Sequence, residues 1–209
     1  MFSVIKKAVL LYAVNLALRS IWDGFSASNG DGLGFVDNSQ RKVKDGSQYD
    51  YLFPKPKYTE LVILENTTIH NTVKFMLKNA KKYAWQTANI SRLLLGSTRL
   101  ETLRRVFKFT FDHIAYRLDD DETEQVRTPA RTWHDRRTGV DCDCFTVFIA
   151  SILENLKIHY KMRVADYTGN GFQHIYIVVP DGNKEVFLDP VIREFNRQKP
   201  YLEKKDYVQ

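Results

Sequence analysis

A change of hydrophobic period in the last third of the chain constrains the fold most. Apolar residues between Cys142 and Leu156 recur at the spacing of one helix face. From Ile158 to Val164, apolar and polar side chains alternate, which is typical of a strand with one buried face. Two more strands are predicted over Phe172–Val179 and Glu185–Asp189. A helix followed by an antiparallel sheet predicts an α+β domain.

The chain before this region continues as a globular pattern from about residue 58. Helices are predicted over Thr68–Tyr83, Ile90–Leu95 and Leu100–Ile114, where apolar residues recur at helical spacing. Hydrophobic residues make up 44% of the 209-residue chain and aromatic residues 13%, which is enough for a core and excludes a disordered or collagen-like chain. We therefore expect one folded domain over residues 58–209.

Residues 1–22 form a separate segment with an amphipathic character. Lys6 and Lys7 precede an apolar run from Ala8 to Leu18, the order found in secretion signals. Arg19 closes the run without a small-x-small cleavage site, and the run is shorter than the roughly 20 residues that span a bilayer. We expect a docking or interfacial helix that could contact a membrane; a signal or anchor stays open as the alternative.

Residues 23–57 are rich in residues that interrupt regular structure. They contain Gly24, Gly30, Gly32, Gly34, Gly46, Pro54 and Pro56. This composition predicts a linker or extended arm that becomes ordered against a partner. Residues 1–57 together are thus a candidate region for assembly with another protein.

The turn between the last two predicted strands places a histidine next to a carboxylate. Asp181-Gly182 is a strong signal for a two-residue hairpin loop. If these two residues form the loop, His174 lies directly opposite Asp189. Opposed residues share a face of the sheet with their Cβ atoms about 5 Å apart. The pattern therefore predicts an imidazole beside a carboxylate.

A cysteine at the start of the predicted helix completes a reactive set. Asp141 is a suitable N-cap, so Cys142 falls in the first helical turn, where the backbone dipoles favour a thiolate. An imidazolium from His174 would stabilise that thiolate, and Asp189 would orient the ring. The charges of Asp141 and Asp143 oppose thiolate formation. We predict a Cys142, His174, Asp189 triad.

Three short motifs carry a resemblance to a known superfamily. Residues Gly139–Thr146, Gln173–Tyr176 and Leu188–Pro190 resemble the cysteine, histidine and aspartate motifs of the transglutaminase-like, papain-related domains. Flanking stretches (Glu124–Pro129, Arg131–Trp133 and Phe195–Asn196) resemble the branch found in bacteria of the Bacteroides group and their phages. The resemblance covers about Thr68 to Tyr201. It implies a cysteine-protease fold in which N-terminal helices and the catalytic helix pack on an antiparallel sheet.

The resemblance also distinguishes the two cysteines. It implies that Cys142 is the nucleophile, His174 the base and Asp189 the orienting acid. Cys144 stands where the superfamily usually has a second aspartate. On a helix its side chain points in a different direction from that of Cys142. We therefore expect Cys144 to be a small buried residue. A zinc site from Cys142, Cys144 and His174 lacks a fourth ligand and the usual cysteine spacing, so no metal or cofactor is expected.

Oxyanion and substrate contacts are less well defined by the sequence. The candidates for oxyanion stabilisation are the Trp133 indole, Gln125 and the backbone N–H of Cys142, although Trp133 is equally suited to a core position.

Arg127, Arg131 and Gln173 are further substrate-binding candidates. The two arginines could bind an anionic substrate group or pair with the acidic stretch Asp119–Glu122. Gln173 could hydrogen-bond substrate or lie on the other face of the sheet.

The predicted chemistry is acyl transfer through a thioester. Cys142 would attack an amide carbonyl of a protein or peptide substrate, for example a cell-wall peptide, with His174 as base and then acid. Water as acceptor gives a peptidase or amidase, and a lysine amine gives a cross-linking enzyme; hydrolysis is favoured because it needs no second substrate site. The alternative class is a non-catalytic module of a phage virion or cell-envelope assembly that uses the same fold.

The net charge of the chain does not point to a further class of function. The excess of 31 Lys and Arg over 25 Asp and Glu gives a formal charge of +6. The basic pairs Lys81-Lys82, Arg104-Arg105 and Arg136-Arg137 are dispersed, so no specific nucleic-acid partner is predicted. The expected location is a bacterial cytoplasm or a phage virion, with envelope association as the alternative.

Overall fold

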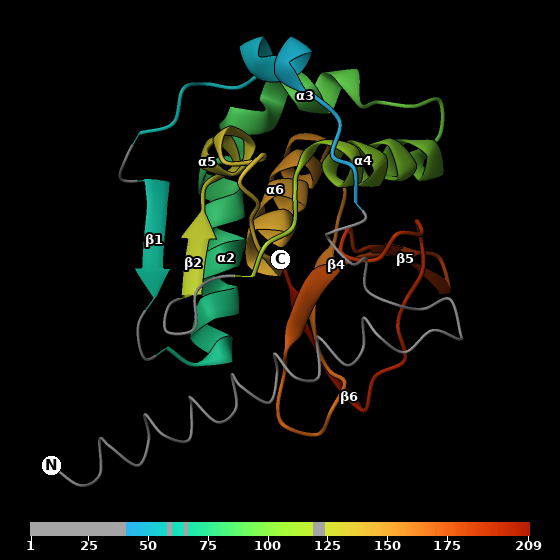
Figure 1. Ribbon diagram of the computed structural model, residues 1–209. Helices are drawn as coiled ribbons and strands as arrows, with labels where there is room; N and C mark the ends of the chain where they lie inside the picture. The colour runs from blue at the N-terminus through green and yellow to red at the C-terminus, as the bar shows by residue number, and fades with distance from the viewer. Residues whose placement is uncertain (1–40, 58–59, 65–66, 119–123) are drawn as a thin grey trace, which may run out of the picture.

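The computed structural model of the chain describes residues 41–57, 60–64, 67–118 and 124–209 (Figure 1). The predictions for residues 1–22, for the first part of the arm and for Asp119–Glu122 lie outside these ranges. The helical elements are η1 (Ser47–Leu52), α2 (Ile69–Lys82), η3 (Ala84–Thr87), α3 (Ala88–Leu93), α4 (Arg99–His113), α5 (Pro129–His134) and α6 (Cys142–Asn155). The strands are β1 (Leu61–Leu64), β2 (Glu124–Arg127), β3 (Lys161–Asp166), β4 (His174–Asp181), β5 (Lys184–Leu188) and β6 (Glu203–Val208).

The architecture is a mixture of helices and antiparallel sheet, which confirms the predicted α+β class. Strands β5, β4, β3 and β6 form one sheet in this order, and β1 pairs with β2 in a smaller one; all these pairs are antiparallel. Figure 1 shows the helices gathered beside the larger sheet, with α6 in the middle of the molecule. No helix in the described ranges is long and apolar enough to cross a bilayer.

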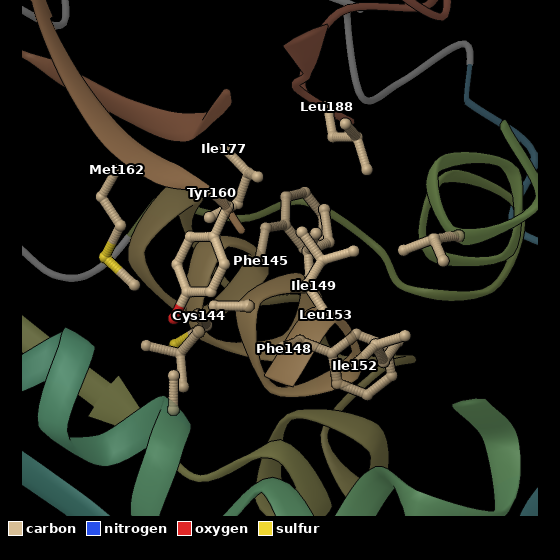
Figure 2. Close-up of a cluster of buried hydrophobic side chains, with 14 of the residues drawn as sticks. Cys144, Phe145, Phe148, Ile149, Ile152, Leu153, Tyr160, Met162, Ile177 and Leu188 are labelled. Atoms are coloured by element: carbon tan, nitrogen blue, oxygen red, sulfur yellow. The ribbon is translucent and has the colours of Figure 1, made fainter. Parts of the chain in front are cut away.

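Helix α6 is the centre of the hydrophobic core. Its side chains are buried nearly all round, as expected for a helix without a polar face. The close-up in Figure 2 shows Phe145, Phe148, Ile149 and Ile152 of α6 among residues of β3, β4 and β5. The helix contacts α2 as well as β4, so it is held in place from several directions.

The outer face of the larger sheet contains a buried ion network. Arg163 of β3 donates hydrogen bonds to Glu185 of β5 and Asp206 of β6, and its side chain is 1% exposed. Hydrogen bonds from Arg163 lower the pKa of Asp206 to about 2, although burial acts in the opposite direction. The network joins β3 to an edge strand on either side and thereby fixes the sheet that carries His174.

The hairpin between β4 and β5 differs from the prediction. Asp181 pairs with Lys184, so the loop is Gly182-Asn183 instead of Asp181-Gly182. Gly182 has a φ of +59° and occupies the first loop position, where a type II′ turn requires glycine. The predicted register is therefore wrong: His174 and Asp189 do not lie directly opposite each other on the ladder.

The second half of the predicted arm is part of the folded domain. Phe53 is buried and its ring stacks on Trp133 with 4.4 Å between centroids. The backbone N–H of Lys44 donates to the carbonyl of Asp112 at the end of α4, at 2.7 Å. Residues from Arg41 onward therefore supply core and helix-end contacts to the domain that the sequence predicts to begin at residue 58.

Candidate active site

Cys142 is the first residue of α6, as the sequence predicts. The Asp141 side chain caps the helix by accepting the backbone N–H of Cys144 at 3.1 Å. Gly139 has a φ of +95°, and a Cβ atom there would lie 2.7 Å from the Cβ of Arg117, so the turn into the helix requires glycine. The backbone N–H groups of this first turn favour a thiolate at Cys142. Asp143 opposes it, with its Oδ1 3.7 Å from the Cys142 sulfur.

His174 and Asp189 form a buried pair. His174 Nε2 lies 2.7 Å from Asp189 Oδ2, and the two side chains are 4% and 3% exposed. The other carboxylate oxygen of Asp189 accepts the backbone N–H of Val191 at 3.1 Å. A carboxylate only accepts hydrogen bonds, so this contact places the ring proton on Nε2 of His174 and directs Nδ1 elsewhere.

This pair forms even though the predicted register is wrong. The ladder between β4 and β5 ends at the pair Ile177 and Leu188, so Asp189 lies just beyond the last paired residue. The backbone N–H of Ile192 donates to the carbonyl of Asp189 at 3.0 Å, which turns the chain there. The carboxylate therefore reaches His174 from a turn and not from a neighbouring position on a strand.

A hydrogen bond joins the start of α6 to the start of β4. Thr146 Oγ1 donates to the carbonyl of Ile175 at 3.2 Å, and both groups are buried. Cys142 precedes Thr146 by one helical turn and therefore lies on the same face of α6. Ile175 directly follows His174. The thiol is thus carried to the end of β4 at which the histidine lies.

Two tyrosines, the buried Tyr116 and the partly buried Tyr167, lie near the charged groups of this site. Burial raises the pKa of the Tyr167 phenol, and the negative charges of Asp189 and of a Cys142 thiolate raise it further. Burial also raises the pKa of Tyr116, and the charges of Cys142, Asp141 and Asp189 add to the effect. Both phenols therefore lie within electrostatic range of the cysteine and of the acid.

The same tyrosine, Tyr167, also belongs to an aromatic frame around the histidine. The His174 ring lies 6.2 Å from the Tyr167 ring and stacks on Tyr176 at 5.6 Å, measured between centroids. Gln198 Nε2 donates to the Tyr176 hydroxyl at 2.5 Å. The Lys199 ammonium lies 4.9 Å from the Tyr167 ring, and burial lowers its pKa to about 8. The frame restricts the orientation of the imidazole.

Cys144 has a different environment from Cys142. It is fully buried, its sulfur donates to the carbonyl of Gln125 at 3.2 Å, and Arg127 Nη1 donates to it at 3.4 Å. Burial raises the pKa of the Cys144 thiol well above its usual value; the Asp141 charge adds to this and Arg127 opposes it. Cys144 is therefore a small buried residue, as predicted, and neither cysteine is in a disulfide.

The side-chain candidates for oxyanion stabilisation have other partners. The Trp133 indole N–H donates to Asp50 Oδ1 at 2.9 Å, and its ring stacks between core aromatics. Trp133 is therefore a core residue, which was the alternative to an oxyanion role. Gln125 Oε1 accepts from Arg127 Nη2 at 2.9 Å. The backbone N–H groups at the start of α6 are therefore the better-placed candidates.

The two arginines bind a carboxylate of the domain itself. Arg127 Nε and Arg131 Nε lie 3.1 Å and 2.7 Å from Asp135 Oδ2. The pKa of Asp135 is lowered: burial acts to raise it, and hydrogen bonds from Arg131, His134 and Arg127 outweigh burial. These contacts indicate that the arginines hold β2 to α5, and they supply a partner that the sequence did not suggest.

Gln173 organises the connection between β3 and β4. Its amide donates to Asp166, Thr168 and Gly171, and its Oε1 accepts the backbone N–H of Tyr167. Asp166 also accepts the backbone N–H groups of Thr168, Gly169 and Gly171, and these bonds lower its pKa although burial acts to raise it. The loop that presents Tyr167 to His174 is fixed by this cluster, which sequence reasoning missed.

Side chains that could bind a metal ion do not cluster in the described part of the chain. No group of three or more His, Cys, Asp or Glu side chains there is arranged to hold a metal ion. Cys142 and Cys144, which would have to share a zinc ion, lie toward β4 and β2 respectively.

Comparison with known proteins does not assign this chain to a family. No family model, curated protein or solved structure matches this chain. The functional interpretation therefore depends on the residues and their geometry.

Proposed function

We propose that the protein is a cysteine-dependent amide hydrolase with a transglutaminase-like fold. The observation that carries the proposal is the buried contact of 2.7 Å between His174 and Asp189, located where the helix that begins with Cys142 meets β4. Cysteine, histidine and acid follow one another in the chain in the order of the three motifs that suggested the superfamily. The cysteine begins a helix, the histidine begins a strand, and the acid lies in the turn after the next strand.

The first half of the reaction makes a thioester. His174 Nδ1 accepts the proton of the Cys142 thiol, and the sulfur attacks the carbonyl carbon of a peptide or side-chain amide. Negative charge develops on the carbonyl oxygen, where N–H groups at the start of α6 can stabilise it. The tetrahedral intermediate then breaks its C–N bond, and the leaving amine takes the proton from His174.

The second half regenerates the enzyme. His174 removes a proton from water as the water oxygen attacks the thioester carbon. The C–S bond breaks, the product leaves as a carboxylic acid, and Cys142 recovers its proton from His174. Asp189 keeps the ring in one tautomer throughout and stabilises the imidazolium. Water is proposed as acceptor because an amine acceptor would need a binding site of its own.

Selective alkylation of the thiol tests this proposal. Intact protein is treated with iodoacetamide at pH 6 and pH 8, and the modified cysteine is located by mass spectrometry. We expect fast labelling at Cys142 alone, slowed about 100-fold or more in His174→Ala because the histidine stabilises the thiolate. His159→Ala, which removes an exposed histidine, is the matched control and should label as wild type does. Slow labelling that is unchanged by His174→Ala would exclude the proposed enzyme.

A further inference from the structure

Arg41 places a guanidinium group against backbone carbonyls in the interior. Its Nε donates to the carbonyl of Phe111 at 3.1 Å and its Nη2 to that of Ile114 at 3.0 Å; Nη2 also donates to Phe111. Its Nη1 donates to the carbonyl of Pro190 at 3.1 Å. Burial lowers the pKa of Arg41 to about 10, with the charge of Asp112 acting in the opposite direction. The group stays cationic at neutral pH.

The contacts with Phe111 and Ile114 explain why the charge is tolerated there. These residues lie at the C-terminal end of α4, where carbonyl groups have no partner within the helix and carry partial negative charge. The guanidinium plane also lies over the Phe111 ring, at 4.1 Å from its centroid. Arg41 therefore acts as a cap for the end of α4.

The contact with Pro190 goes beyond helix capping. Pro190 directly follows Asp189 and lies inside the turn in which Asp189 Oδ1 accepts the N–H of Val191. Arg41 thus connects this turn to the end of α4 through the Pro190 carbonyl. A shift of the turn would change the distance between the carboxylate and the imidazole.

We propose that Arg41 is a positioning residue of the site, which holds the turn at Pro190 so that Asp189 stays on His174 Nε2. This inference depends on the proposed function. It also means that the segment preceding η1, which the sequence suggests is a linker, is a working part of the enzyme. A planar guanidinium can reach the helix end and the turn at once; a lysine ammonium has no such fork.

Lys44 provides the matched control on the same segment. Its ammonium lies 2.8 Å from Asp112 Oδ2 at the same helix end, and its side chain is 59% exposed. The charge of Lys44 therefore supports α4 in a similar way, and its hydrogen bond goes to Asp112 instead of the turn at Pro190. Loss of Lys44 should affect α4 without affecting Asp189.

The test compares Arg41→Lys, Arg41→Gln and Lys44→Gln by the pH profile of Cys142 alkylation, with Cys144 as an internal reporter of unfolding. We expect both Arg41 variants to slow Cys142 labelling roughly tenfold at pH 6, the size typical of residues that orient a site histidine. The loss should be smaller at pH 9, where a thiol ionises without help, and Cys144 should stay unlabelled. Lys44→Gln should have the wild-type profile.

Two results would overturn the inference. If Arg41→Lys labels at the wild-type rate and pH profile while His174→Ala is slow, Arg41 does not position the site and the proposed function stands. If Cys144 becomes reactive together with Cys142 in Arg41→Lys, the residue serves only to stabilise the fold. An unchanged rate in His174→Ala identifies the separate case in which the proposed function itself fails.

Discussion

The first turn of α6 presents two thiols to two different environments. Toward β4, Cys142 is partly exposed and lies at the end of the strand that carries His174. Toward β2, Cys144 is enclosed and bonded to the Gln125 carbonyl and to Arg127. Two residues of the same type on one helix thus differ in exposure and in hydrogen-bond partners because of what packs against each face. We therefore expect the surroundings, and not the CxC sequence, to set the reactivity of each thiol.

Exchange of each cysteine for alanine gives the largest expected contrast. Cys142→Ala should reduce amide hydrolysis by at least about 10³-fold, because the acyl group has no other acceptor. Cys144→Ala should keep activity and lower the free energy of unfolding by about 1 kcal/mol through loss of a small buried side chain. Turnover and urea unfolding measure the two effects. Equal losses of activity in both variants would contradict the division of roles.

Replacement of the acid should have the next largest effect. Asp189→Asn removes the charge that stabilises the imidazolium and can hold the ring in the wrong tautomer, so kcat should fall by about 10²–10⁴-fold. The measurement is kcat on the same amide substrate, with Asp181→Asn on the exposed hairpin as control. A kcat within twofold of wild type would show that the carboxylate has a structural role only.

A smaller effect is expected from the carboxylate beside the nucleophile. Asp143 lies 3.7 Å from the Cys142 sulfur, and its negative charge opposes thiolate formation. Asp143→Asn should therefore increase the thiolate fraction at a given pH and move the alkylation profile of Cys142 to lower pH. The rate at pH 6 should rise at least about fivefold, since a like charge at 3.7 Å costs about 1 kcal/mol even at the dielectric constant of water, and Asp143 is buried. A shift to higher pH would mean that Asp143 assists the site.

Local patterns predicted the elements that carry the site. The helical period after Cys142 and the alternation in the following strand correspond to α6 and β3, and Asp141 is the N-cap that the sequence suggests. The histidine and the acid are also in contact as predicted. The helix, its cap and the strand depend on neighbours in sequence, which is why a single chain suffices to find them. The contact between His174 and Asp189 forms instead through a turn that the hairpin signal did not indicate.

Long-range packing was not accessible in the same way. Asp181-Gly182 indicates a hairpin, but which residue takes the left-handed position depends on the twist of the completed sheet. Arg41 resembles any linker arginine until α4 and Pro190 are both in place. The strand β6 is mostly charged, and its pairing depends on the ion network with Arg163.

The ionisation state of Cys142 tests the central claim most directly, since the claim is that the thiol and His174 act as one unit. In the Cys144→Ala background, thiolate absorbance near 240 nm is followed from pH 4 to pH 9. The account predicts substantial thiolate at pH 6 that disappears when His174→Ala is added. A single transition near the ordinary thiol value of about 8.5, the same with and without the histidine, would contradict it and leave a fold used for binding alone.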